Sequence, residues 1–176
     1  ITGKNIKPDD VVLGLPSSGL HTNGYSFARK LFFEIGKHDV NDTIPELEKS
    51  VGLTLLEPHI NYTNHVFSVL DNGIDVKGIA HITGGGLVEN IPRILPNGCG
   101  VRLQKESWPS LPVFDLMQSI GNVDENEMAR AFNLGIGMVF IVDSANVNKV
   151  KNALKDLTAV YEIGMIVRGE KVVKIK

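Results

Sequence analysis

One segment of the sequence combines polar side chains and glycines in a pattern that suits phosphate binding. It begins with an apolar run that ends in His81 and Thr83. Three consecutive glycines, Gly84, Gly85 and Gly86, follow and form a glycine loop. Glycines between a strand and a helix let backbone N–H groups approach an anion closely, and the helix start adds a partial positive charge. The segment therefore predicts a site for a phosphate-bearing ligand.

An amphipathic helix is expected over residues 87–95, directly after the glycine loop. Its buried face carries Leu87, Ile91 and Ile94. Asn90 and Arg93 lie off that face, so both can reach a ligand above the helix start, and arginine suits bidentate contact with a phosphate. Two plainer alternatives are a flexible turn made by the glycines and an ordinary helix ion pair between Glu89 and Arg93, worth about 0.2–0.5 kcal/mol.

A second polar loop follows an expected strand over residues 11–15 and opens an expected helix over residues 24–35. The loop carries hydroxyl, imidazole and amide side chains beside glycine, at Ser17, Ser18, Gly19, His21 and Asn23. Gly19 and Gly24 have the spacing of a nucleoside-triphosphate P-loop. No lysine follows the second glycine, so that kind of site is excluded.

His21 is the least typical turn residue of this second loop. It is a candidate general base, or a candidate hydrogen-bond donor to a substrate. The plainer alternative is a turn with a helix cap, since Asn23 or Ser26 can cap the helix that follows. The spacing of the residues does not separate the two interpretations.

A third segment, residues 132–138, joins the end of an expected helix to the start of an expected strand. Its glycines, Gly135 and Gly137, are explained by a helix C-cap and a turn, which is the commoner use of glycine there. The five histidines are scattered and no Cys/His cluster has zinc spacing, so no metal site is predicted. The sequence has no Gly-x-Ser-x-Gly motif, which disfavours a serine hydrolase.

The chain has 176 residues, a net charge of -2 and one cysteine, Cys99. This length fits one domain with a sizeable core. Nucleic acid is not an expected partner, because phosphate neutralisation needs clustered Lys and Arg. A lone cysteine forms no internal disulfide, so a reducing, cytoplasmic setting is expected. A membrane is not expected either, since no apolar run approaches the roughly 20 residues of a membrane span.

Expected strands and helices alternate along the chain. The strands are expected over residues 11–15, 76–82, 100–103, 136–142, 161–167 and 171–175. The helices are expected over residues 24–35, 45–51, 62–70, 87–95, 112–120, 125–132 and 147–157. The last two strands are close enough to form a hairpin. The fold class predicted is α/β of the α+β type, with a mixed β-sheet layered with helices.

Three stretches, residues 14–26, 80–93 and 132–138, together resemble the family of aminoimidazole ribonucleotide synthetase, which is also called phosphoribosylformylglycinamidine cyclo-ligase. The resemblance spans nearly the whole chain in the right order. The middle stretch, with His81, the glycine loop and Arg93, is the most specific. It separates this family from thiamine-phosphate kinases and hydrogenase-maturation proteins, which share the fold.

The resemblance implies that this chain is one of two domains. Residues 1–10 would be a lead-in segment, and residues 11–176 a single C-terminal domain. An N-terminal domain, absent from this chain, would supply acidic Mg²⁺ ligands, most of the ATP site and most of a homodimer interface. A start at Ile1 fits a domain fragment. The isolated fragment is expected to be inactive.

The implied reaction converts formylglycinamidine ribonucleotide to aminoimidazole ribonucleotide in purine biosynthesis. ATP would activate an amide oxygen as a phosphate ester, and an amidine nitrogen would then close the ring. His21 is the first choice for proton transfer and His81 the second. The expected binding residues are Ser17, Ser18, Gly19, Asn23, Thr83, Gly84, Gly85, Gly86, Asn90 and Arg93. Alternatives are a related ATP-dependent kinase or phosphotransferase, and a non-catalytic phosphate-binding module.

Two short stretches depart from the family pattern. Asp9-Asp10 stands where the family tends to have Gly-Asp, in the lead-in segment. Residues 58–62 read Pro-His-Ile-Asn-Tyr, whereas the family often has Pro-Thr-Arg-Ile-Tyr. Ile60 thus replaces an arginine, and this loss implies a divergent branch or altered substrate contacts.

Overall fold

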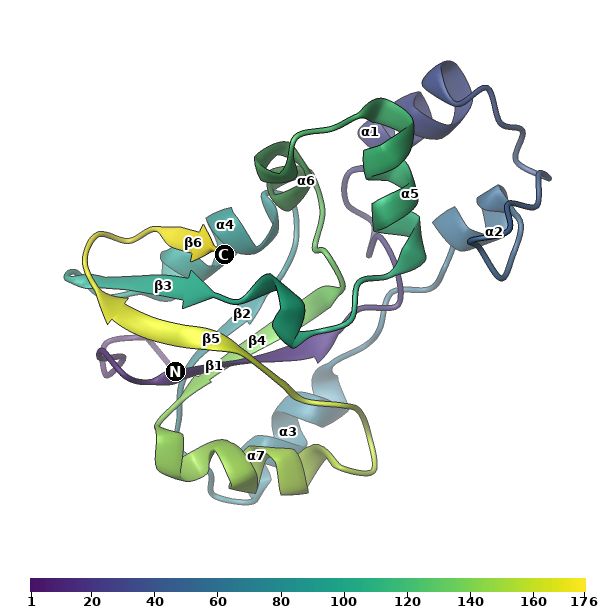
Figure 1. Ribbon diagram of the computed structural model, residues 1–176. Helices are drawn as coiled ribbons and strands as arrows, with labels where there is room; N and C mark the ends of the chain where they lie inside the picture. Colours follow the sequence, from purple (N-terminus) through teal and green to yellow (C-terminus); the bar gives the residue numbers. More distant parts are fainter.

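The apolar, β-branched runs of the sequence form a six-stranded sheet in the computed structural model, which describes residues 1–176 (Figure 1). The strands are β1 Val11–Pro16, β2 Val76–His81, β3 Cys99–Leu103, β4 Ile136–Val142, β5 Tyr161–Arg168 and β6 Val173–Ile175. Their order across the sheet is β2-β4-β1-β5-β3-β6, and only β3 and β6 pair in parallel. The sheet is therefore mixed, as predicted.

The predicted hairpin between the last two strands is wrong. β5 already pairs with β1 on one side and with β3 on the other, so β6 adds to the outer side of β3. The turn between β5 and β6 crosses over Gly100, where a Cβ atom would lie 2.5 Å from the carbonyl oxygen of Glu170. A glycine at this position allows the chain to cross the strand closely before it pairs.

Seven α-helices accompany the sheet: α1 Tyr25–Arg29, α2 Val51–Leu55, α3 Thr63–Asp71, α4 Gly86–Asn90, α5 Pro112–Gly121, α6 Glu125–Ala131 and α7 Val147–Leu154. α1 continues into a π-helix over Lys30–Ile35, and α4 continues into a 3₁₀-helix over Ile91–Ile94. Two further 3₁₀-helices cover Lys105–Ser107 and Ser144–Asn146. None of the helices is both long and apolar enough to pass through a bilayer.

The helix predicted over residues 45–51 is wrong. The helix in this region, α2, begins only at Val51, because the Ser50 hydroxyl accepts a hydrogen bond from the Leu53 backbone N–H and caps it there. The preceding residues form a loop that is closed by a bridge between Thr43 and Ser50. The other predicted helices and strands are present within a few residues of their expected bounds.

Helices α3 and α7 cover one face of the sheet (Figure 1). Side chains alternate along β1, so Leu13 and Leu15 pack with these helices and Val12 packs on the opposite face. β4 is buried along its whole length, which explains its uninterrupted apolar sequence. The side chains of β4 contribute to the buried clusters on both faces of the sheet.

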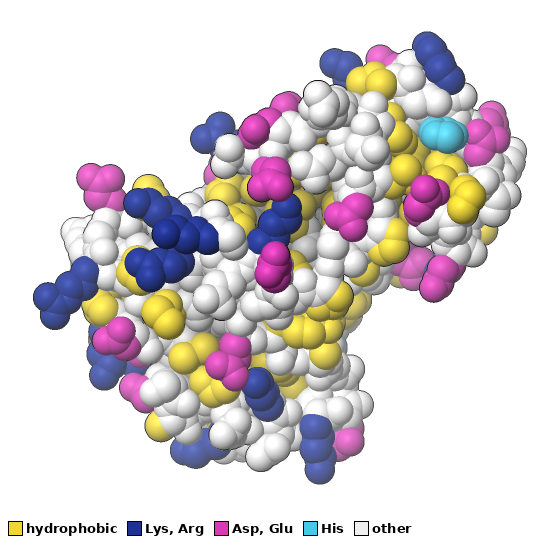
Figure 2. Space-filling model, in the orientation of Figure 1, with side chains coloured by type: hydrophobic (Ala, Val, Ile, Leu, Met, Phe, Trp, Pro, Cys, Tyr) yellow, Lys and Arg dark blue, Asp and Glu magenta, His cyan; other side chains and the backbone are white.

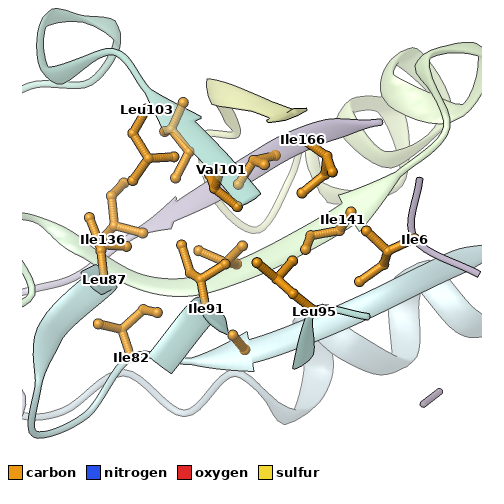
Figure 3. Packing of buried hydrophobic residues seen from close by; sticks show 14 of the residues in the cluster. Ile6, Ile82, Leu87, Ile91, Leu95, Val101, Leu103, Ile136, Ile141 and Ile166 are labelled. Atoms are coloured by element: carbon orange, nitrogen blue, oxygen red, sulfur yellow. The ribbon is translucent and has the colours of Figure 1, made fainter. Parts of the chain in front are cut away.

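The opposite face of the sheet is covered by α4 and the 3₁₀-helix that follows it. Leu87 and Ile91 are fully buried there and pack beside Ile136 and Ile141 of β4 (Figure 3). Ile6 belongs to the same cluster, so the lead-in segment contributes to the core. The glycine loop is therefore attached to a helix whose position is fixed by the core.

A third group of buried residues lies beyond the sheet, among α1, α2, α5 and α6 (Figure 1). Its largest side chains are Phe32, Phe114 and Phe132. Phe132 follows α6 directly and stacks on Phe27 of α1, with ring centroids 5.9 Å apart. This helical group packs against the segment that follows β1 and the segment that precedes β4, through Leu20, Ala28 and Phe132.

Candidate functional site

The three polar segments meet at one end of the sheet, where β1 and β2 end and β4 begins. β4 runs antiparallel to both β1 and β2, and Pro16 pairs with Ile136 while His81 pairs with Met138. The loops that follow β1 and β2 therefore emerge on either side of the chain that enters β4. Residues far apart in the sequence come together in one candidate site.

Two glycines of these segments are required by close packing. Gly24 has φ 73°, and a Cβ atom there would lie 2.5 Å from the ring of Phe132. Gly86 has φ 57°, and a Cβ atom there would lie 2.1 Å from the carbonyl oxygen of Ala129. Both conditions exclude side chains. The starts of α1 and α4 are thus packed against the end of α6, which brings the two loops together.

The glycine loop is partly open and lies beside the loop after β1. Gly84 is exposed, and a Cβ atom on it would meet only the side-chain oxygen of Asn23, at 3.6 Å. The backbone N–H groups of Gly84 and Gly85 donate no hydrogen bond within the chain, whereas the Gly86 N–H donates to Thr83. Two free donors in an open glycine turn are the feature that an anion site needs.

Asn90 holds the glycine loop in place and is not free to contact a ligand. It is 4% exposed, and its amide nitrogen lies within 2.8–3.2 Å of the carbonyl oxygens of Thr83, Gly84 and Gly86. Its side-chain oxygen accepts from the Thr83 hydroxyl and from Arg93. The geometry favours a positioning role for Asn90, in place of the ligand contact expected from the sequence.

Arg93 is exposed and makes no ion pair with Glu89, so the plainer alternative for these two residues is wrong. One guanidinium nitrogen donates to the Asn90 side-chain oxygen at 3.1 Å. The remaining guanidinium donors are available to a phosphate.

Ser17 is also occupied by contacts within the protein. Its hydroxyl donates to the side-chain oxygen of Asn133 at 2.8 Å, and the Asn133 amide nitrogen donates to the carbonyl oxygen of Gly19 at 2.8 Å. Asn133 is 2% exposed and also accepts from the Gly135 N–H. This network joins the loop after β1 to the chain that enters β4. The sequence does not predict this role of Asn133, because its partners Ser17 and Gly19 lie more than 100 residues away.

The loop after β1 is not a capped turn. α1 is preceded by Gly24 in the left-handed conformation, with no side-chain cap, so neither Asn23 nor Ser26 caps the helix. Asn23 instead donates to the carbonyl oxygen of His21 at 2.8 Å. His21 and Thr22 both have positive φ, 52° and 62°, which is a strained conformation for residues with side chains. The surrounding contacts hold this strained loop in one shape.

His21 is completely buried at the base of the loop. Its Nε2 atom accepts hydrogen bonds from the backbone N–H groups of Ser18, at 3.0 Å, and Ile60, at 3.4 Å. Because Nε2 acts as an acceptor, the ring proton is assigned to Nδ1. Burial, followed by the charges of His59 and His81, lowers the pKa of His21 to about 4. A buried, neutral ring of this kind favours a positioning role over the proton transfer expected from the sequence.

His59 and His81 form the accessible part of a histidine cluster. The His59 ring stacks on His21, with centroids 4.1 Å apart and planes inclined by 16°. The Nε2 atoms of His59 and His81 are 3.0 Å apart, so one ring donates a hydrogen bond to the other. Partial burial and the nearby His59 lower the pKa of His81, which keeps it neutral at pH 7. No regular sequence spacing relates these three histidines, so the sequence did not indicate that His59 lies beside His21 and His81.

Ser18 connects the cluster to the segment before α3. Its hydroxyl lies 2.9 Å from the Nε2 atom of His21 and donates to the carbonyl oxygen of Pro58 at 2.6 Å. Tyr62 donates its hydroxyl proton to the carbonyl oxygen of Pro16 at 2.6 Å. These bonds fix the position of residues 58–62 beside the ends of β1 and β2.

The cluster borders a cavity of about 560 Å³. Its lining residues are His59, Ile60, Asn61, Tyr62, Thr63, Val66, Phe67, His81 and Met138. A larger cleft of about 900 Å³ lies among α5, α6 and β6, near a gathering of Lys and Arg side chains (Figure 2). None of the expected binding residues lines the cleft or the smaller cavity, but His81, a candidate catalytic residue, lines the smaller cavity. The smaller cavity is the one that belongs to the candidate site.

Stability is expected to fall as the pH is lowered from about 6.5 to about 4. In the unfolded chain His21 takes up a proton near its ordinary pKa of 6.5, whereas the folded chain excludes that proton down to about pH 4. The contribution of His21 to the free energy of unfolding is fully present above pH 6.5. Between pH 6.5 and pH 4 that free energy falls by up to about 1.4 kcal/mol per pH unit. The lowered pKa values of His65 and His81 act in the same direction.

Urea denaturation at a series of pH values measures this effect. A His21→Gln variant is expected to be less stable at pH 7 and to show a shallower pH dependence. An identical slope in the variant would show that His21 is not the group responsible.

The sheet, its order and the motifs at its edge define the C-terminal domain of the AIR synthase related proteins. That family matches residues 7–176, and the chain belongs to it. The chain is 48% identical over 162 residues to phosphoribosylformylglycinamidine cyclo-ligase of Caldanaerobacter subterraneus subsp. tengcongensis, covering 92% of this chain and 48% of that protein. This chain spans about half the length of the curated relatives that it matches.

Solved structures of more distant proteins share the fold. Thiamine-monophosphate kinase from Stenotrophomonas maltophilia K279a is 15% identical and has a TM-score of 0.63, over 100% of this chain and 52% of that one. The hydrogenase maturation protein HypE in complex with ATP is 15% identical and has a TM-score of 0.61, over 98% of this chain and 49% of that one. The predicted family and the predicted fold class are confirmed.

Proposed function

We propose that this chain is the C-terminal, substrate-binding half of an ATP-dependent cyclo-ligase that converts formylglycinamidine ribonucleotide to aminoimidazole ribonucleotide in purine biosynthesis. The observation that carries the proposal is the 48% identity to a protein named as this cyclo-ligase, over 92% of the chain. The three family motifs lie together at one end of the sheet, and this supports the proposal because residues of one binding site must lie close to one another.

The reaction requires a held phosphate, an activated amide oxygen and removal of a proton from the attacking nitrogen. The free N–H groups of Gly84 and Gly85, together with Arg93, form the proposed phosphate contact. This phosphate is the ribose 5-phosphate or a phosphate of ATP. Thr83, Gly86 and Asn90 hold the loop in a shape that presents these donors.

His81 is the proposed proton acceptor in this chain. It is exposed at the end of β2, beside the glycine loop, and its neutral ring can take a proton from the attacking amidine nitrogen. His21, the first choice from the sequence, instead positions Ser18 and the His59 ring. Asn23 borders the glycine loop and is the proposed polar contact to the substrate from the loop after β1.

Mg²⁺ prefers oxygen ligands in an octahedral arrangement and is usually held by one or two carboxylates together with substrate phosphates. No group of three or more Asp, Glu, His and Cys side chains is placed to hold a metal ion. We propose that an N-terminal domain supplies the acidic Mg²⁺ ligands, most of the ATP site and a homodimer interface, in a cytoplasmic enzyme. ATP binding by the structurally similar HypE supports the requirement for ATP.

The proposed activity is tested with the full-length protein, ATP and formylglycinamidine ribonucleotide. The expected result is formation of aminoimidazole ribonucleotide with release of one ADP and one phosphate per turnover. ATP consumption that yields only a phosphorylated acceptor would instead identify a related kinase or phosphotransferase. Residues 1–176 alone are expected to show no turnover, and measurable turnover by them would contradict the assignment of the ATP site to another domain.

A further inference from the structure

We propose that His59 is a positioning residue for His81. Its Nε2 atom accepts the hydrogen bond from Nε2–H of His81, which leaves Nδ1 of His81 free to take a proton from the substrate. This inference rests on the proposed function, in which His81 is the proton acceptor of the ring closure. His59 lies outside the three family motifs, in the stretch 58–62 that departs from the family pattern.

The contact between the two rings is direct. The Nε2 atoms of His59 and His81 are 3.0 Å apart, which is hydrogen-bond distance, and neither side chain makes another hydrogen bond within the chain. Neither ring forms an ion pair with a carboxylate. Both residues line the cavity of about 560 Å³. His59 is therefore the one group of the chain that orients the His81 ring through a hydrogen bond.

The direction of this bond decides whether His81 can act as a base. A neutral imidazole has one protonated nitrogen and one nitrogen with a free lone pair. Because Nε2 of His81 is occupied by His59, only Nδ1 can accept a proton from a substrate. Nδ1 has its lone pair free when the proton of His81 is on Nε2 and His59 presents an unprotonated Nε2. The hydrogen bond made by one ring nitrogen thus sets the state of the other.

The proton is accounted for at each atom. During ring closure the N–H bond of the attacking amidine breaks, and its electron pair stays on the nitrogen that bonds to the ring carbon. The proton passes to Nδ1 of His81, while the Nε2 proton remains donated to His59. His81 is exposed and afterwards releases the proton from Nδ1 to solvent.

Neighbouring residues hold His59 in place. Its ring stacks on the buried His21 ring, with centroids 4.1 Å apart and planes inclined by 16°. The residues on either side are also held, since the Pro58 carbonyl oxygen accepts from the Ser18 hydroxyl at 2.6 Å. The Ile60 N–H donates to Nε2 of His21 at 3.4 Å. A supporting ring that is itself fixed keeps the reacting group in one geometry.

Two variants of the full-length enzyme separate positioning from packing. His59→Phe keeps a ring to stack on His21 but has no acceptor, whereas His59→Gln loses the ring but keeps an oxygen that accepts from His81. We expect kcat to fall about 10–100-fold in His59→Phe, because a misplaced reacting group costs up to about 10²-fold, and to stay within about threefold in His59→Gln. Equal or higher turnover in His59→Phe than in His59→Gln would overturn the proposal, since a ring that only fills space gives that order.

A double variant tests whether His59 acts through His81. In a His81→Gln background, His59→Phe is expected to cause no further fall in kcat, because the residue that it positions is already lost. A further fall of the same size would show that His59 contributes independently, and would exclude the proposed role. The control is His38→Gln, at a histidine that is paired with Asp42 outside the candidate site, and it should keep wild-type turnover.

Long-range proton–nitrogen NMR of the full-length protein, labelled at its histidines, tests the bond without any turnover. The expected spectrum has a protonated Nε2 in His81, an unprotonated Nε2 in His59 and a coupling between these two nitrogens. The signals are assigned by their loss in His81→Gln and His59→Phe. A His81 ring protonated on Nδ1 would overturn the proposal. Failure of the wild type to form aminoimidazole ribonucleotide would contradict the proposed reaction alone, since the spectrum tests the contact separately.

Discussion

Replacing His81 with glutamine in the full-length enzyme is expected to lower turnover by about 10²–10⁴-fold, which is the usual contribution of a general acid or base. His81 is exposed, has a lowered pKa that keeps it neutral at pH 7, precedes the glycine loop by three residues and is hydrogen-bonded to His59. Glutamine can keep a hydrogen bond to His59, but it cannot accept a proton. The fold should be preserved, because the side chain of His81 makes no other hydrogen bond within the chain.

The measurement is the initial rate of aminoimidazole ribonucleotide formation, together with the thermal unfolding midpoint. His21→Gln is the matched comparison. It removes the ring nitrogen that accepts two backbone N–H groups, so we expect a loss of about 1–3 kcal/mol in unfolding free energy. Turnover within about threefold of the wild type in His81→Gln would remove His81 from the reaction. An unchanged midpoint in His21→Gln would contradict its positioning role.

Proton transfer by His81 also predicts the pH dependence of turnover. Only the neutral ring accepts a proton, so activity is lost as the pH falls through the pKa of this group. Because burial and His59 lower that pKa below its ordinary value of 6.5, the acidic limb of the pH–rate profile should lie below pH 6.5.

Much of the sheet could be predicted because β1 and β4 are continuous apolar runs and the other strands are rich in β-branched residues. The run that forms β4 is buried at every position, and no helical periodicity competes with it. The pairing of β6 could not be predicted, since it depends on which edges β5 had already used. A short sequence separation suggests a hairpin, but the available edge of the sheet decides the partner.

The sequence singled out each polar loop separately, and the strand pairing is what brings the two loops together. The sequence could not show that the side chains of Ser17 and Asn90 are satisfied within the protein. It also could not place His59 against His81, because that contact arises from the path of a loop between two helices.

Replacing Gly86 with alanine is expected to reduce the free energy of unfolding by about 3 kcal/mol or more. The backbone there has φ 57°, and the added Cβ atom would lie 2.1 Å from the Ala129 carbonyl oxygen and 2.6 Å from that of Phe132. These neighbours are backbone atoms at the end of α6, so a rotamer change cannot relieve the clash. The glycine loop would have to move away from α6, and phosphate binding would be lost with it.

Gly84→Ala is the matched control for Gly86→Ala, because it adds the same methyl group two residues away. Gly84 lacks a positive φ and its Cβ atom would meet only Asn23, at an ordinary contact distance of 3.6 Å. Urea denaturation should therefore show a change within about 0.5 kcal/mol for this variant. Its methyl group would nevertheless occupy the space above the free N–H groups, so KM for the phosphorylated substrate should rise. If both variants were equally stable, close packing on α6 would not be the reason for glycine at position 86; if KM were unchanged in Gly84→Ala, the loop would not contact the phosphate.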